Sequence, residues 1–235
     1  MALVVSVMIT VMVAVTVTAP PSRAQAVTCP SAPPPEVSVG VVAERPVMDH
    51  SRSVAELSRI RTDTRSPYAA DIHTWTGGLT RGSIRLGGDI RIRFYRFPGR
   101  GLVCAAYAAL DLEIRLSATV FIARDYARLS CRYRAVRDHE MKHVDMDRRI
   151  ALDWVPTIRA GVMQATRRNR AIGPYPDTDL DTIRSNMNTY VRNIMQDLQA
   201  RLTSDRLARQ QGIDSLEEYE SVRQKCRWPI MRGNR

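Results

Sequence analysis

Three absences narrow the function of this 235-residue chain. None of its four cysteines lies in a Cys-x-x-Cys arrangement, so the sequence gives no support for a zinc ribbon or a thioredoxin-type site. No basic run with interleaved aromatic residues is present, which argues against nucleic acid as a partner. The pair Gly87-Gly88 is not followed by a helix start, so it is predicted to form a turn or bulge rather than a phosphate-binding loop.

Lysine is nearly absent, because only Lys142 and Lys225 accompany 33 arginines in a chain of net charge +11. The arginines predict a basic surface. Such a surface would attract anionic polymers or lipids of a cell envelope.

The N-terminus predicts export. An apolar run from Ala2 to Val17 is followed by Pro20-Pro21 and by Ala24-Gln25-Ala26, a small-x-small pattern that signal peptidase cleaves. Residues 1–26 are therefore interpreted as a signal peptide cleaved near Ala26, and the mature chain is expected to be secreted or periplasmic. If the segment stays uncleaved it would act as a membrane anchor, which is the only membrane contact that we expect.

The cysteines agree with export. All four lie beyond the signal peptide, and an even number in an oxidising compartment predicts two disulfides. Their spacing leaves all three connectivities open. The four cysteines are Cys29, Cys104, Cys131 and Cys226.

Residues 27–47 are rich in proline and are predicted to form a linker or an extended lead-in strand. Residues 48–235 are then one domain, in which Ser53 and Glu56 form a capping box that begins a short helix. Alternating apolar residues predict strands around 84–86, 90–94, 110–116 and 119–122. Together these strands are expected to form a small, mainly antiparallel sheet.

From Asp125 onward the apolar residues recur at helical spacing. The pattern predicts a long helix that Pro156 kinks or splits, and a stop at Gly173-Pro174. A second helix from about Leu180 would pack beside it, and a short last helix would begin at Asp214 or Ser215. The fold class predicted is therefore α+β: strands first, then a long helix and a packed C-terminal helical hairpin.

The long helix carries the motif His139-Glu140-Met-Lys-His143. Residues four apart lie one turn above each other, so the two imidazoles can bind a common Zn²⁺ ion. Glu140 is turned about 100° from His139 and is placed to take a proton from a water molecule at the metal. The chance of such a motif arising at random in a chain with so few histidines is about 0.002.

The residues around this motif resemble two groups of proteins. Val136, three residues before His139, matches the aliphatic position of the zincin metallopeptidases. The stretch "HEMKHVDMDRRIALDW" is more closely similar to a bacterial family of predicted secreted zinc-dependent proteases, a domain of unknown function whose His-Glu-x-x-His motif begins a long helix after a β-rich half. The resemblance implies a zincin-like domain, Zn²⁺ ligation by His139 and His143, and general-base chemistry by Glu140.

A catalytic zinc ion needs a third protein ligand, which the sequence leaves open. Asp147 lies one turn beyond His143, too far along the helix to join both histidines, and is interpreted as a carboxylate outside the ligand set. His73, beside Trp75, is more typical of a packing residue. Carboxylates of a different helix are better candidates: Asp177, Asp179 and Asp181, or Asp214, Glu217 and Glu218.

Two functions remain after these observations. The first is an exported zinc-dependent metallohydrolase, a peptidase that cleaves peptide or protein substrates in the cell envelope on a platform formed by the sheet edge. The second is a non-enzymatic envelope binding or structural protein, in which His139 and His143 lie on an exposed helix face and the motif is vestigial or coincidental. The surroundings of the two histidines distinguish them.

Overall fold

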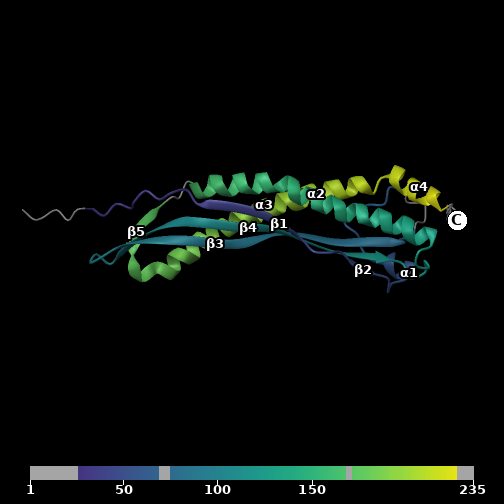
Figure 1. The fold of residues 1–235 in the computed structure, drawn as a ribbon, viewed down its shortest axis with the longest axis horizontal. Helices are drawn as coiled ribbons and strands as arrows, with labels where there is room; N and C mark the ends of the chain where they lie inside the picture. The colour runs from purple at the N-terminus through teal and green to yellow at the C-terminus, as the bar shows by residue number, and fades with distance from the viewer. Residues whose placement is uncertain (1–25, 69–74, 168–170, 227–235) are drawn as a thin grey trace, which may run out of the picture.

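A computed structural model describes residues 26–68, 75–167 and 171–226 of the chain. The predicted signal peptide lies outside the described residues apart from Ala26, and so does His73. The elements are β1 (Glu36–Ala43), β2 (Val47–Asp49), α1 (Val54–Leu57), β3 (Gly78–Phe97), β4 (Leu102–Ile122), α2 (Cys131–Arg167), β5 (Ile172–Pro176), the 3-10 turn η1 (Asp177–Asp179), α3 (Leu180–Ile213) and α4 (Leu216–Lys225). They form an elongated molecule in which long helices run along long strands (Figure 1).

Strand β4 is the centre of the sheet. Strand β3 pairs with it antiparallel over its whole length, through a tight turn at Pro98–Gly101. Because β3 occupies one edge of β4, the strands β1, β2 and β5 share the other edge, each along a different stretch. Strands β1 and β2 run parallel to β4, whereas β5 runs antiparallel to it.

The prediction of a small, mainly antiparallel sheet is wrong. Two of the four strand pairings are parallel, and the short predicted strands merge into β3 and β4, of 20 and 21 residues. Alternating apolar residues reveal which face of a strand is buried but not the direction of its partner. Strand β1 comes from the proline-rich lead-in, so the sequence pattern did not reveal the parallel partner. The α+β class itself is consistent with the structure.

The pair Gly87-Gly88, for which the sequence predicts a turn or bulge, lies inside β3, and Gly88 lets the strand continue there. Gly88 has φ of +145°, and a Cβ atom there would lie 2.2 Å from the carbonyl oxygen of Asp111 on β4. Further along, the register shifts between Arg91 and Ile92, where β4 contains one extra residue, Ala108. This bulge reverses the alternation of side-chain directions along β4. The apolar residues before and after it therefore face the same layer of helices.

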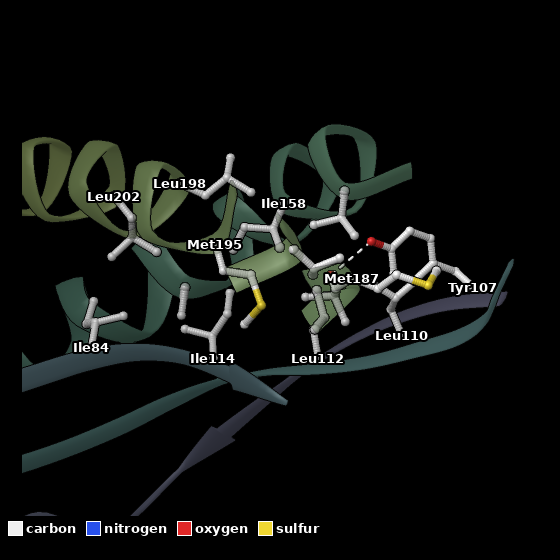
Figure 2. Packing of buried hydrophobic residues seen from close by; sticks show 14 of the residues in the cluster. Ile84, Tyr107, Leu110, Leu112, Ile114, Ile158, Met187, Met195, Leu198 and Leu202 are labelled. Carbon is white, nitrogen blue, oxygen red and sulfur yellow. Dashed lines mark hydrogen bonds between the residues drawn. The ribbon is translucent and has the colours of Figure 1, made fainter. Parts of the chain in front are cut away.

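The main core lies between β4 and the helices α2 and α3. Leu110, Leu112 and Ile114 of β4 are at most 3% exposed and meet residues of both helices. Figure 2 shows this contact, in which the Tyr107 hydroxyl also donates a hydrogen bond of 2.9 Å to the backbone carbonyl of Met187. Burying apolar surface stabilises a fold by about 25 cal/mol per Å². The burial of these side chains therefore holds the two helices against the sheet.

Helix α2 continues through Pro156 as one helix of 37 residues, so a split at this proline is not observed.

None of the helices in the described part of the chain combines the length and the apolar character that crossing a membrane requires. The capping box of Ser53 and Glu56 is confirmed at the start of α1.

Both predicted disulfides form. One joins Cys29 to Cys104 and ties the lead-in to β4, and the other joins Cys131 at the start of α2 to Cys226 at the end of α4. Disulfides persist in oxidising compartments, so the pair fits a protein that lies outside the cytoplasm.

The adjacent glycines of β3 give a matched test of this register. We expect Gly88→Ala to lower the free energy of unfolding by about 2 kcal/mol or more, because the added Cβ meets the β4 backbone at a strained φ. Gly87→Ala is the control, since a Cβ there has nothing within 4 Å and should change stability by less than about 1 kcal/mol. Chemical denaturation measures both, and equal effects would contradict the register.

Candidate metal centre

The two histidines of the motif share one face of α2, as their spacing predicts, and in the structure that face is the inner one. His139 and His143 are 8% and 9% exposed, and Glu140 between them is 5% exposed. Their rings meet edge to face with centroids 5.1 Å apart. The exposed helix face expected for a coincidental motif is therefore not what the structure has.

Small residues on β3 let this face of α2 approach the sheet. Gly78, Thr80 and Gly82 alternate along the strand and point toward α2. A Cβ on Gly78 would lie 2.4 Å from a methyl group of Val136 and 2.8 Å from a carboxylate oxygen of Glu140. The missing side chains thus create the space that the polar residues of α2 occupy.

A third candidate ligand converges on the histidines from the junction of α3 and α4. The Asp214 Oδ1 atom lies 3.3 Å from Nε2 of His139 and 3.2 Å from Nε2 of His143. Bonds of 2.0–2.1 Å in a tetrahedron around Zn²⁺ require neighbouring ligand atoms to lie about 3.3 Å apart. All three ligand atoms lie within 4.8 Å of one another, and the two distances to Asp214 are those that a tetrahedral site requires, so the three residues could hold a metal ion.

Asp214 is held in place by more than the histidines. It is 5% exposed and follows α3 directly, before Ser215 caps α4 by accepting a hydrogen bond from the Glu218 backbone. Burial alone would raise the pKa of the Asp214 carboxyl, but hydrogen bonds from His139, His143 and Thr64 hold it well below its usual range. The carboxylate is consequently ionised and oriented, as a metal ligand must be.

The outer nitrogens of both imidazoles have oxygen acceptors. Nδ1 of His139 lies 3.4 Å from Oε1 of Glu218, and Nδ1 of His143 lies 2.5 Å from Oε1 of Gln210. The Gln210 amide nitrogen already donates to Asp147 and to the His143 carbonyl, which makes its oxygen the acceptor. Each Nδ1 can therefore donate a hydrogen bond, so in a neutral imidazole Nε2, the nitrogen nearest Asp214, would be the atom that binds a metal.

Asp147 anchors this arrangement without being a ligand. It is 4% exposed and accepts two parallel hydrogen bonds, of 2.8 and 3.0 Å, from the Arg206 guanidinium on α3. The Gln210 amide donates a third, of 2.6 Å. The interpretation of Asp147 as a carboxylate outside the ligand set is consistent with this geometry, and its contacts fix the residue that orients His143.

Glu140 lies next to the three candidate ligands. Its Oε2 atom accepts a hydrogen bond of 2.8 Å from the Thr80 hydroxyl. Burial raises the pKa of the Glu140 carboxyl above its ordinary value, although the nearby His139 and His143 act in the opposite direction. Burial alone would lower the pKa of His143, but its hydrogen bond to Asp214 and the charge of Glu140 raise it overall. These four groups thus form one coupled set of charges.

The site opens into a cavity of about 500 Å³ between β3, α2, the end of α3, α4 and the segment 60–68. Tyr219 of α4 lies over the site, with its ring centroid 5.5 Å from that of His139. Trp75 and Leu207, both exposed, add apolar surface to the lining. The cavity is therefore large enough for several residues of an extended chain or for a small molecule.

The edge of β3 that faces away from β4, to which no strand of the described residues is paired, borders this cavity. The carbonyl of Gly77 accepts a hydrogen bond from the backbone of Ala123, so residue 77 points its backbone groups toward β4. Because these directions alternate along a strand, Gly78, Thr80 and Gly82 point theirs away from β4. All three residues line the cavity. A row of backbone donors and acceptors thus faces the space beside the candidate ligands.

The other predicted candidates lie elsewhere. The group of residues within ligand distance includes Asp214 but not Glu217, and Glu218 instead binds His139 and Lys142. His50, which the sequence did not put forward as a ligand, donates a hydrogen bond of 2.9 Å from Nδ1 to the Ile122 carbonyl and packs edge to face on Tyr133. Asp177, Asp179 and Asp181 lie at η1 and the start of α3 and are not part of the group.

Sequence reasoning missed the polar residues that position the site. Gln199, Arg206 and Gln210 follow one another along α3 at spacings of seven and four, and Asp214 comes four residues later. A polar row at helical spacing beside an apolar stripe was the available signal. The alternation of Gly78, Thr80 and Gly82 was a second signal, since glycine in a strand marks a close approach.

Comparison with models of known protein families, with curated proteins and with solved structures finds no match for this chain.

Asp147 and Asp145 allow a matched test of the buried network. We expect Asp147→Asn to lower the free energy of unfolding by about 2 kcal/mol, because it leaves the largely buried Arg206 guanidinium without a counter-charge. Asp145→Asn removes an exposed pair with Arg148 on the same helix and should cost less than about 1 kcal/mol. Denaturant unfolding compares the two, and a smaller loss for Asp147→Asn would refute the role given to the network.

Proposed function

We propose that this chain is an exported zinc-dependent metallohydrolase that cleaves peptide bonds. The observation that carries the proposal is the convergence of His139, His143 and Asp214 on one point beside the buried Glu140, at the wall of a cavity. Two imidazoles and one carboxylate leave a fourth tetrahedral position open for water or substrate. The predicted signal peptide, cleaved near Ala26, would place the enzyme in the periplasm or outside the cell.

The donor set suits zinc. Neutral imidazole nitrogen and carboxylate oxygen are ligands that Zn²⁺ prefers, and hydrogen bonds from Nδ1 to Glu218 and Gln210 are the kind that orient such ligands. A Zn²⁺ ion bound by these residues would act as a Lewis acid on a carbonyl group and would lower the pKa of a coordinated water to about 7.

Glu140 is the general base in this proposal. Its carboxylate would accept a proton from the water as the water oxygen attacks the carbonyl carbon, and would later deliver that proton to the amine nitrogen as the C–N bond breaks. Burial raises the pKa of Glu140, which makes its carboxylate a stronger base than one in solvent. The Thr80 hydroxyl holds the carboxylate in position through Oε2.

The free edge of β3 supports a peptide as the substrate. An extended chain could add to Gly78, Thr80 and Gly82 as a further strand, with its backbone hydrogen-bonded to theirs. Thr80 binds Glu140, and a Cβ atom on Gly78 would lie 2.8 Å from a Glu140 carboxylate oxygen, so a chain added there would pass beside the base. The row of backbone groups recognises any peptide, and the side chains lining the cavity would select among them.

Metal content tests the ligand set. We expect the purified protein to hold one Zn²⁺ per chain, and Asp214→Asn to weaken zinc binding by about 100-fold or more because a charged ligand is lost. Glu217→Gln is the control, since Glu217 is exposed and lies outside the group. Metal analysis and competition with a chelator measure the affinities. Wild-type protein without bound zinc under zinc-replete conditions would disprove the proposal.

Activity tests the base. We expect Glu140→Gln to retain zinc while peptide hydrolysis falls by about 100-fold or more, the usual contribution of a general base. His143→Ala should lose both zinc and hydrolysis. If zinc binds stoichiometrically but no peptide in a diverse library is cleaved, the non-enzymatic alternative, an envelope binding or structural protein, is favoured instead.

A further inference from the structure

The groove along β3 ends where α3 lies against the strand. Its lining residues run from Gly77, just before β3, to Gly82 and stop there. On α3 the lining residues begin at Arg206. Beyond Gly82, α3 lies against the strand, and the side chain of Gln199 reaches the strand backbone.

Gln199 occupies the position of an added strand. Its Oε1 atom accepts a hydrogen bond of 2.7 Å from the Leu86 backbone nitrogen, and its Nε2 atom donates one of 3.0 Å to the Ile84 carbonyl. Residues 84 and 86 have the same parity as Gly82, so these are the next outward-facing groups of the same edge. The side-chain amide thus occupies the backbone donor and acceptor that the N–H and C=O groups of an added strand would otherwise bind.

The block is held firmly. Nε2 of Gln199 also donates to the hydroxyl of Thr203, 3.1 Å away, and that hydroxyl donates to the Gln199 carbonyl. The neighbouring Leu198 and Leu202 are at most 5% exposed and belong to the main core. A substrate strand that continued past Gly82 would have to displace the Gln199 side chain from its two hydrogen bonds with the strand.

The block lies close to the reacting groups. Thr80 binds Glu140, and four residues of strand, about 13 Å, separate Thr80 from Ile84. An extended chain passing Glu140 therefore has room for about four residues before it meets Gln199.

Resting on the proposed function, we propose that Gln199 closes this groove and makes the enzyme act near the free end of a peptide chain, within about four residues of it. The substrate class is then short peptides and chain termini rather than interior segments of long chains.

A length series tests this inference. Peptides that share one cleavage sequence are extended separately on each side by two, four, eight and twelve residues, and kcat/KM is measured with the zinc-loaded protein. We expect extension beyond about four residues to reduce kcat/KM at least tenfold on one side only. Blocking the amino or the carboxyl terminus of the shortest peptide identifies which end enters. Equal cleavage of all lengths on both sides would overturn the inference.

Variants at Gln199 test whether this side chain causes the length limit. We expect Gln199→Ala and the shorter amide in Gln199→Asn to relieve the length limit at least tenfold, measured as the ratio of kcat/KM between the shortest and the longest peptide. Gln196→Ala, on the exposed face of the same helix, should leave the limit unchanged. Zinc content and a thermal melt establish that each variant is folded. A limit that persists in a folded Gln199→Asn protein would refute the role of Gln199.

A binding experiment distinguishes failure of this inference from failure of the proposed function. The same peptides, fluorescently labelled, are titrated into the zinc-loaded Glu140→Gln protein, which should bind short peptides at least tenfold more tightly than long ones. Absence of hydrolysis by the wild type would refute the peptidase proposal while this binding series still decides the length limit. Binding that does not depend on length, or no binding of any peptide, would overturn the inference.

Discussion

The close contact between α2 and the first residues of β3 is the constraint on which the rest of the site depends. Gly78 and Gly82 have no side chain to keep the helix away, and Thr80 offers a short hydroxyl between them. Glu140 and Asp147 of α2 fill the space. A buried carboxylate must find hydrogen bonds or charge partners, because leaving water without them costs several kcal/mol. That requirement explains why so many polar residues gather around one helix face.

Helix α3 has two roles. Its apolar stripe packs in the core, and its row of polar residues positions the site. Gln199 holds the edge of β3, Arg206 neutralises Asp147, and Gln210 orients His143. Because these residues extend from a helix anchored by Leu198 and Leu202, their positions follow from the packing of the core. The same side chains that orient the candidate ligands also shape the groove beside them.

The second disulfide completes the enclosure. Helix α4 buries only Val222 among its residues, so apolar packing holds it weakly. The bond between Cys131 and Cys226 ties its end to the start of α2, while Glu218 contacts His139 and Lys142. A short polar helix is thereby kept over the candidate ligands with Tyr219 above them.

The sequence by itself determined the long helices, the shared helix face of His139 and His143 and the presence of two disulfides, because helical spacing and cysteine number are local properties. It also placed Asp214 among six candidate ligands. Only the tertiary structure singled out Asp214 among them, since the end of α3 comes near α2 through core packing rather than through any pattern near residue 214. The parallel pairing of β1 with β4 was likewise decided by tertiary structure, because alternation records burial and carries no information on the direction of a partner strand.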